Sequence, residues 1–247
     1  NLVAGRMIKK RLERMFTARE IRLERDLKRH ADFADKPRKK ILIAGSSGLI
    51  GRQLVAFLDT GGHDVWRLVR RKAKKDEKEL VWNPDVGIIN HDVLEGFDAI
   101  IHLGGAGIGD KRWSKKRMKL IEESRTKSTT LLANAITKLA KKPEAFIVAS
   151  AVGWYGNRGD EELDETSTQG EGFLPETCAR WEESCQAARD IGVRTINLRT
   201  GIVLDATGGA LGKMLLPAKL GAGGPIGRGK QWYSWISMDD QIYSIHH

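Results

Sequence analysis

The feature that most constrains the fold is the stretch ILIAGSSGLIG at residues 41–51. Its aliphatic residues are typical of a short buried strand, and apolar residues at helical spacing follow it. Gly45 permits a tight turn, Gly48 lets backbone N–H groups approach a pyrophosphate at a helix N-terminus, and Gly51 lets helix and strand pack closely. The stretch therefore predicts a dinucleotide-binding strand–turn–helix unit.

Apolar and amphipathic segments alternate along the rest of the chain. We expect strands at 41–44, 65–69, 99–103, 146–149 and 195–198, with helices after the glycine turn, at about 114–139 and at about 175–190. Strands that alternate with helices connect through right-handed crossovers. Residues 39–247 are therefore predicted to form one α/β domain, a Rossmann-type fold with a doubly wound parallel sheet.

Residues 1–38 are predicted to form an amphipathic helical leader that ends in a linker around Pro37. The first 40 residues hold 14 Lys and Arg against 6 Asp and Glu, so most of the net charge of +10 lies there. The apolar stripe of such a helix needs a surface, which the main domain, an upstream domain or another subunit could provide. A basic arm can attract phosphate or lipid, but no nucleic-acid motif accompanies it, so a solvated helix face is favoured over a nucleic-acid partner.

The composition indicates the cellular compartment and argues against a membrane span, a disulfide and a metal site. No apolar run approaches the roughly 20 residues that span a bilayer, and no signal peptide opens the chain. Cys178 and Cys185 would lie about 10 Å apart on a helix, too far for a disulfide. Without a disulfide or a signal peptide, we expect a cytoplasmic protein. No Cys/His spacing typical of metal sites is present, so we expect no metal site.

The residues that follow the second strand indicate which dinucleotide is bound. An NAD site usually has a carboxylate there, whereas this chain has Arg70 and Arg71, which suit the 2′-phosphate of NADP(H). The alternative is a solvated basic loop. The residues predicted to contact the cofactor are Gly45, Ser47, Gly48, Leu49, Ile50, Gly51, Arg70, Arg71, Leu103, Gly104 and Gly105.

Longer motifs carry a family resemblance. They are DKRW at 110–113, ESR at 123–125, SAVGWYG at 150–156, CARWE at 178–182, LRTGIVLD at 198–205 and GGPIGRGKQWYSWISMDD at 223–240. From Lys40 onward the chain resembles the sugar-nucleotide epimerase-like family of atypical extended short-chain dehydrogenase/reductases, some members of which are labelled as cell-division inhibitors. The leader resembles the end of an upstream START/cyclase-like domain. The family usually continues beyond this C-terminus, so the resemblance implies a truncated substrate region.

The resemblance also exposes a departure in the catalytic machinery. Other members of the superfamily use a Tyr-x-x-x-Lys pair, but Leu174 and Cys178 stand at those positions here, and Ala151 replaces the assisting serine. Packing is the expected role of Cys178. We predict Tyr155 and Ser150 as replacement catalytic residues, with cleft lining as the alternative for Tyr155.

Cationic and aromatic residues near the expected cleft could hold an anionic substrate. The alternative is a glycine-rich surface loop with an aromatic core, and His102 within its apolar strand is expected to be a core histidine. The residues predicted to bind substrate are Lys111, Arg112, Trp113, Arg199 and Trp232.

Two functional hypotheses follow from these observations. The first is an NADP(H)-binding epimerase or oxidoreductase that lacks the usual pair and acts on a nucleotide-sugar or another anionic small molecule. The second is a non-catalytic NADPH-binding regulator linked to cell division. The glycine turn supports both hypotheses. The missing pair favours the second, whereas the Lys111–Trp113 and Trp232–Trp235 clusters favour the first.

Overall fold

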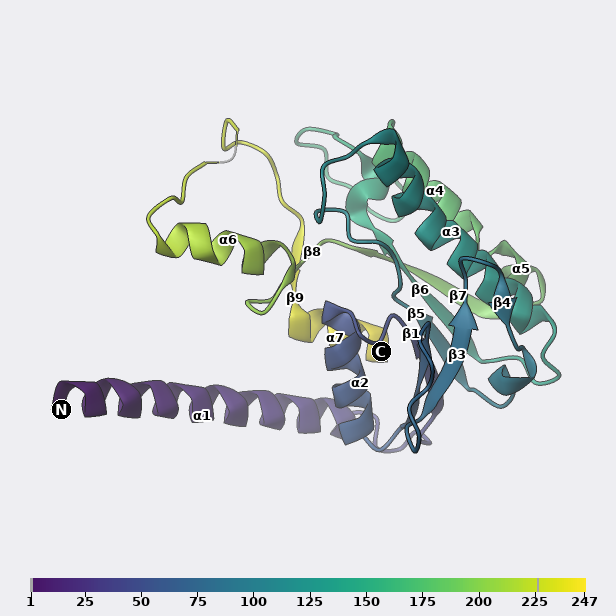
Figure 1. The fold of residues 1–247 in the computed structure, drawn as a ribbon, viewed down its shortest axis with the longest axis horizontal. Coiled ribbons are helices and arrows are strands. Elements are labelled where there is room, and N and C mark those ends of the chain that lie inside the picture. The colour runs from purple at the N-terminus through teal and green to yellow at the C-terminus, as the bar shows by residue number, and fades with distance from the viewer. Residues whose placement is uncertain (1, 226) are drawn as a thin grey trace.

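A seven-stranded sheet forms the centre of the computed structural model, which describes residues 2–225 and 227–247. Its strand order is β4-β3-β2-β1-β5-β6-β7, and all neighbours run parallel except β3 and β4 (Figure 1). The predicted α/β fold with a doubly wound parallel sheet is confirmed. The strands are β1 (Lys40–Ala44), β2 (Asp64–Val69), β3 (Glu79–Asn83), β4 (Ile88–Ile89), β5 (Ala99–His102), β6 (Ala145–Ala151) and β7 (Arg194–Thr200).

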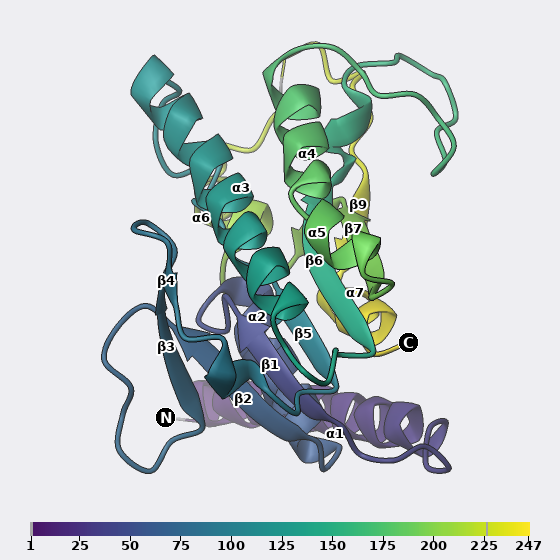
Figure 2. The same ribbon diagram turned by 90° about the vertical axis from the view of Figure 1, so that its right-hand side faces the viewer.

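Helices cover both faces of the sheet because its strands are apolar on both sides. Leu42 of β1 packs toward α3 (Lys115–Thr137), α4 (Phe173–Glu183) and α5 (Gln186–Asp190). The next residue, Ile43, packs toward α2 (Leu49–Thr60) and α7 (Met238–His246). Figure 2 shows α3, α4 and α5 together on one side of the sheet. This alternation along β1 creates two separate cores.

Several elements differ from the sequence prediction. The helix expected at 175–190 is two helices, because the chain breaks at Ser184 and Cys185. Elements that were not predicted are β3, β4, α6 (Gly209–Lys219), and the small parallel pair of β8 (Ile202–Leu204) and β9 (Trp235–Ser237). Most of these are short and partly exposed, so they carry little apolar periodicity.

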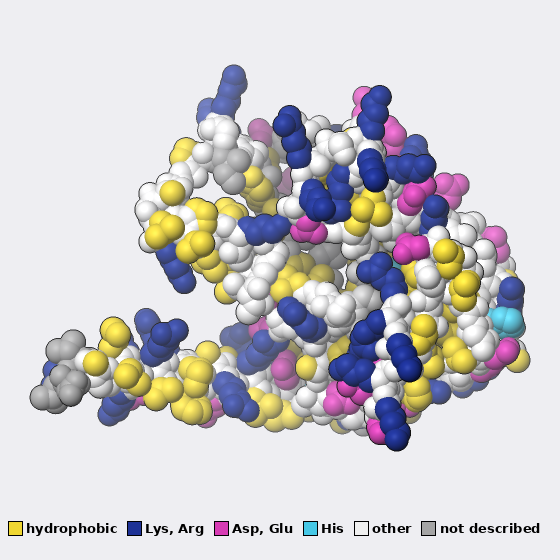
Figure 3. Space-filling view, in the orientation of Figure 1, with side chains coloured by type: hydrophobic (Ala, Val, Ile, Leu, Met, Phe, Trp, Pro, Cys, Tyr) yellow, Lys and Arg dark blue, Asp and Glu magenta, His cyan; other side chains and the backbone are white. Residues whose placement is uncertain are grey.

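The leader forms one long helix, α1 (Leu2–Ala31), as the apolar spacing predicts. Its C-terminal part contacts the domain: Tyr243 Oη of α7 donates to Asp26 Oδ1 at 2.8 Å, and Arg29 Nη2 donates to the Tyr243 carbonyl at 3.2 Å. The N-terminal part projects as an arm that exposes apolar side chains such as Leu12 and Phe16 (Figure 3). None of the helices in the described part of the chain has the length and apolar character to cross a membrane.

Candidate functional site

The sheet has a topological switch point between β1 and β5, because the chain leaves β1 toward β2 and later returns to its other side at β5. Ligands of open α/β sheets bind outside the carboxyl ends of the strands at such a point. Here Leu103 N–H donates to the Ala44 carbonyl at 2.9 Å. Gly45 has φ +85°, and a Cβ on it would lie 2.7 Å from Gly104 N. The floor of this crevice is therefore backbone against backbone.

The glycine turn then presents the N-terminus of α2. Gly48 is the N-cap residue, and no described side chain caps the helix there. A Cβ on Gly48 would lie 3.2 Å from the Gly45 carbonyl oxygen, and one on Gly51 only 2.3 Å from it. The first-turn N–H groups and the positive end of the helix dipole thus face a cradle without side chains. These residues fit the pyrophosphate of a dinucleotide.

The remaining predicted turn residues lie at the edge of this cradle. Ser47 is exposed, and Leu49 and Ile50 are half-buried. A Cβ on Gly208, just before α6, would lie 3.1 Å from Leu49 Cδ1. Gln53 Nε2 of α2 also donates to Asp205 Oδ2 at 2.6 Å. The segment between β8 and α6 therefore lies directly beside the glycine turn.

The structure gives Arg70 and Arg71 different surroundings. Arg71 donates to both carboxylate oxygens of Glu79, at 2.7 and 2.5 Å. That bidentate pair is the main reason that the pKa of Glu79 falls to about 2. Arg70 is exposed and makes no hydrogen bond or ion pair with any other described residue. Of these two arginines, Arg70 is therefore the one that can bind a phosphate without first losing an ion pair.

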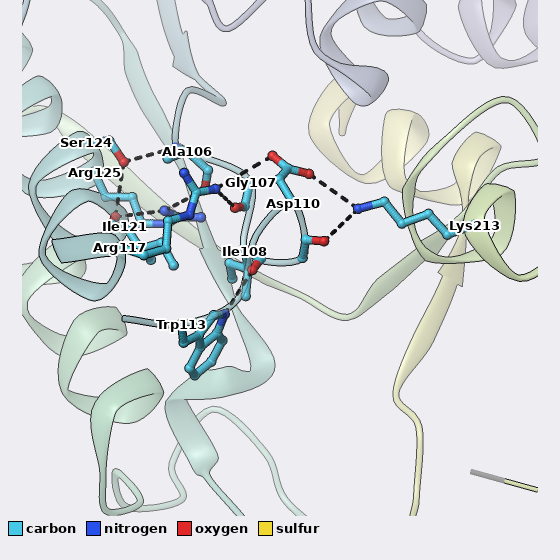
Figure 4. Close-up of polar contacts among 11 residues, drawn as sticks. Ala106, Gly107, Ile108, Asp110, Trp113, Arg117, Ile121, Ser124, Arg125 and Lys213 are labelled. Atoms are coloured by element: carbon cyan, nitrogen blue, oxygen red, sulfur yellow. Dashed lines mark hydrogen bonds and ion pairs between the residues drawn. The ribbon is translucent and has the colours of Figure 1, made fainter. Parts of the chain in front are cut away.

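Helix α3 holds the backbone at Ala106, directly after the predicted Gly104–Gly105 segment (Figure 4). Arg125 Nη1 donates to the Ala106 carbonyl at 3.1 Å and to the Ile121 carbonyl at 2.8 Å, and Ala106 N–H donates to Ser124 Oγ at 3.0 Å. The Arg125 guanidinium is buried and lies 5.0 Å from the Trp181 ring centre. Burial lowers the pKa of Arg125. These contacts fix the backbone that faces the crevice.

His102 lies beneath the same segment and is fully buried. Its Nε2 lies 2.8 Å from Ser128 Oγ, and Gly104 N–H donates to its Nδ1 at 3.4 Å. Burial, followed by the nearby Arg125 charge, lowers its pKa to about 4. His102 is thus the core histidine that the sequence predicts.

The loop between β5 and α3 connects the crevice to α6 (Figure 4). Lys213 of α6 donates to the Gly109 carbonyl at 2.8 Å and pairs with Asp110 at 3.3 Å. Trp113 Nε1 donates to the Ile108 carbonyl at 2.9 Å, which leaves the ring 42% exposed. Lys111 and Arg112 are exposed and form no ion pair with other described residues. The loop thus offers two free cations beside an exposed indole.

A second cluster lies at the carboxyl ends of β6 and β7, where Ser150 and Arg199 are neighbours in the strand register. Glu182 of α4 joins them: Ser150 Oγ donates to its Oε1 at 2.6 Å, and Arg199 makes a bidentate pair with it through Nε and Nη2, both at 2.9 Å. Arg199 Nη1 donates to Tyr155 Oη at 3.2 Å. The Glu182 contact is the main reason that the pKa of Arg199 rises.

This cluster brings together three of the predicted site residues: Ser150, Tyr155 and Arg199. Tyr155 is 9% exposed. A pocket of about 290 Å³ lies beside Arg199, between β7, β9 and α7. Trp232 is not part of the cluster, because its indole Nε1 donates to Asp160 Oδ1 at 2.6 Å.

The positions of the missing pair face the 3-10 turn at Val152–Tyr155. A Cβ on Gly153 would lie 3.5 Å from Leu174 Cβ and 3.6 Å from Cys178 Sγ. Cys178 is 4% exposed, and burial is the main reason that its pKa rises to about 11. Both cysteines are free thiols. Cys178 therefore packs as a neutral thiol, as the sequence analysis expects.

Two residues that organise these clusters, Glu182 and Arg125, were not predicted from the sequence. Glu182 belongs to the quoted CARWE motif, where it was given no role, although it links Ser150 to Arg199. Arg125 belongs to the quoted ESR motif, yet its contact with the Ala106 carbonyl carries no local signal. Finding Glu182 would have required the register of β6 and β7 and the face of α4 that packs against them. Residue spacing alone reveals neither the register nor the face.

Comparisons with known proteins identify the family of the chain. A sequence model of the NAD dependent epimerase/dehydratase family matches residues 41–247. Epimerase family protein Mb2239 of Mycobacterium bovis is 39% identical over 205 residues, which cover 83% of this chain and 67% of that protein. Human epimerase family protein SDR39U1 is 36% identical over 211 residues, which cover 84% of this chain and 69% of that protein.

Two solved structures are also similar. The nucleoside-diphosphate sugar epimerase from Corynebacterium glutamicum is 38% identical with a TM-score of 0.82, and the match covers 94% of this chain and 49% of that one. Human SDR39U1 (isoform 2) with NADPH is 32% identical with a TM-score of 0.71, covering 82% of this chain and 67% of that one. The chain thus spans about half the length of the corynebacterial protein.

Proposed function

Because the chain is an NAD(P)-binding member of the NAD dependent epimerase/dehydratase family, we propose that it uses NADP(H) to transform an anionic small molecule. The family predicted from the motifs is thereby confirmed. The observation that carries the proposal is the contact of Arg199 Nη1 with Tyr155 Oη at 3.2 Å. This contact sets a permanent cation beside a phenol in a site whose lysine position holds Cys178.

The cofactor assignment rests on the crevice at the switch point. The backbone of Gly45, Gly48 and Gly51 would hold the pyrophosphate, and Arg70 would pair with the 2′-phosphate. The human relative binds NADPH, which supports this choice over NAD. When bound, the cofactor supplies or accepts a hydride.

Tyr155 would exchange a proton with the substrate. The Arg199 guanidinium, itself held by Glu182, stabilises the phenolate that such a transfer would leave. Ser150 Oγ already donates to Glu182, so its role in this proposal is to orient the carboxylate rather than to contact the substrate.

The substrate would carry negative charge. Lys111 and Arg112 are free cations beside the exposed Trp113 ring, and Trp232 is 77% exposed. Cations and aromatic rings together suit a phosphorylated sugar or its nucleotide. The corynebacterial relative is described as a nucleoside-diphosphate sugar epimerase, so such sugars are the first substrates to test.

The test compares wild-type protein with Tyr155→Phe in turnover of nucleoside-diphosphate sugars, with products followed by NMR. We expect turnover to be lost and NADPH affinity to stay within about three-fold, because the affinity comes from the glycine turn and Arg70. Tyr243→Phe is the matched control, since its phenol contacts Asp26 of α1 instead. Full activity of Tyr155→Phe would contradict the proton-transfer role.

One observation favours the regulator hypothesis as a second candidate. The hydroxyls of Ser150 and Tyr155 are both engaged by other side chains, and Leu174 and Cys178 cannot replace a Tyr–Lys pair. A regulator would bind NADPH tightly without turning over any nucleoside-diphosphate sugar. Tight binding without turnover in the wild-type protein would therefore favour this candidate.

A further inference from the structure

Three histidines from distant parts of the chain meet beneath α2, away from the crevice. His30 lies in the last turn of α1, His63 between α2 and β2, and His246 at the end of α7. One ring nitrogen of each lies within 4.8 Å of the others. We propose that these three imidazoles bind a divalent transition-metal ion, with Zn²⁺ as the ion that fits best.

Aromatic packing accounts for the rings but not for their nitrogens. The three imidazoles contact one another and Phe57, with ring centres 4.1 to 6.4 Å apart. His30 Nδ1, His63 Nε2 and His246 Nδ1 are nevertheless buried without a hydrogen-bond partner among the described residues. Buried polar atoms are nearly always paired, so three unpaired nitrogens in one cluster indicate a missing partner.

His30 has the features of a metal ligand. Its Nε2 donates to the Phe57 carbonyl at 3.0 Å, which leaves the Nδ1 lone pair free. Metal-bound histidines usually make such a hydrogen bond through the other ring nitrogen. The ring is 5% exposed and lies against Gly61, where a Cβ would come within 2.2 Å of His30 Cε1. A glycine at this position therefore leaves the space that the ring occupies.

His63 must adjust to bind an ion. Its Nδ1 accepts the Lys39 N–H at 3.1 Å, so coordination through Nε2 requires that this hydrogen bond be released. One neutral hydrogen bond is a small loss beside a metal–imidazole bond. In a tetrahedral zinc site the nitrogens lie about 3.4 Å apart, so the rings must also move closer together.

Burial and the charges around the cluster determine the protonation state of the three imidazoles. Burial lowers the pKa of all three imidazoles, to about 4 for His246, so the rings are neutral ligands at physiological pH. The Arg38 charge lowers the pKa of all three further and Arg29 that of His246, whereas Asp26 acts in the opposite direction on His30. Imidazole ligands suit zinc, copper and nickel, and three of them leave a fourth position for water. Such an ion would fasten the end of α1 to the domain.

The test uses the full 247-residue chain without a polyhistidine tag, dialysed against chelator and titrated calorimetrically with Zn²⁺. We expect one ion per chain and a higher midpoint of thermal unfolding. His30→Ala and His246→Ala should each weaken binding by more than the roughly 10- to 100-fold that loss of an outer-shell partner costs. His91→Ala is the control, since His91 is a half-exposed histidine next to Asp92 and lies outside the cluster.

Two further measurements locate the ion and guard against misfolding. Hydrogen exchange of the amides in the last turn of α1 should slow with Zn²⁺ in the wild type and not in His246→Ala. His30→Gln, with far-ultraviolet circular dichroism as the fold check, replaces His30→Ala if that variant does not fold. Absence of saturable binding to the wild type, or unchanged affinity in the folded His30 and His246 variants, would overturn the proposal.

Discussion

The two ends of the candidate site are built from different materials. At the carboxyl ends of β1 and β5 the crevice is made of backbone, with Gly45 against Gly104 and the uncapped start of α2. At the carboxyl ends of β6 and β7 it is made of side chains, in which Glu182 joins Ser150 to Arg199. The first end can bind a pyrophosphate through its backbone alone, whereas the second depends on each side chain of the cluster.

This difference explains how the chain retains a cofactor crevice while lacking the Tyr-x-x-x-Lys pair. Backbone N–H groups are unaffected by substitutions on α4. At the other end, Leu174 and Cys178 face Gly153, and the cation that contacts the Tyr155 phenol is Arg199 from β7. The two ends should therefore respond independently to mutation.

The largest expected effect comes from Gly48→Val at the backbone end. The residue has φ −71° and ψ 175°, which valine adopts readily, but its Cβ would lie 3.2 Å from the Gly45 carbonyl oxygen, so the fold should lose about 1–3 kcal/mol. The branched side chain would block the N–H groups of α2, removing two charge-assisted hydrogen bonds. Calorimetry should show NADPH affinity reduced by about 4 kcal/mol, roughly a thousand-fold.

Gly224→Val is the matched control for that variant, because a Cβ on Gly224 meets no atom within 4 Å. Its NADPH affinity should equal that of the wild type. Unchanged NADPH affinity in folded Gly48→Val would mean that the glycine turn does not bind the pyrophosphate. The backbone end would then not be the cofactor-binding part of the site.

The second effect belongs to the side-chain end. Glu182→Ala leaves Arg199 without its carboxylate and Ser150 Oγ without its acceptor, and side chains of this ion pair are only 19% and 13% exposed. Removal of one partner from a largely buried pair should cost about 3 kcal/mol, measured by urea unfolding. NADPH affinity of the folded protein should change little.

Glu122→Ala provides the control, because Glu122 pairs with the half-exposed Arg180 of the same helix, α4. An exposed pair of this kind contributes about 0–1 kcal/mol. Equal losses of stability in the two variants would mean that the Glu182 cluster is no more structural than a surface ion pair.

The sequence predicted the backbone end much better than the side-chain end. The turn glycines follow a strand and begin a helix, so their role can be predicted from the neighbouring residues in the sequence. Glu182, Ser150 and Arg199 meet only after three elements have packed, and Arg71 is held by Glu79 of a strand that apolar spacing does not reveal. Long-range pairing of side chains leaves no periodic signal in the chain.

The third prediction compares Arg70 with Arg71, which both follow β2 beside the backbone end of the site. Arg70→Ala should lower NADPH affinity by about ten- to a hundred-fold and leave NADH affinity nearly unchanged, because Arg70 is free for the 2′-phosphate. Arg71→Ala should affect both cofactors alike, since Arg71 is held by Glu79. If Arg71→Ala selectively weakened NADPH instead, Arg71 would be the residue that reads the phosphate.

The smallest effect concerns Cys178 at the lysine position of the side-chain end. Its pKa is 9.0 in an ordinary environment and about 11 in the fold, mainly because the thiol is buried and then because Glu182 is near. Above about pH 9 the unfolded chain releases a proton that the folded chain keeps, so stability falls as the pH rises toward 11. At about pH 10 this thiol should account for a loss of about 1 kcal/mol.

Cys178→Ala removes that contribution, while the cavity it leaves costs the same at every pH. Unfolding by urea between about pH 8 and pH 10 should therefore give a shallower loss of stability for the variant than for the wild type. Burial also raises the pKa of Cys185, but that thiol is present in both proteins and cancels in the difference. Parallel curves would mean that the Cys178 thiol ionises as readily in the fold as in the unfolded chain. In that case the lysine position could carry charge, and the contrast between the two ends of the site would weaken.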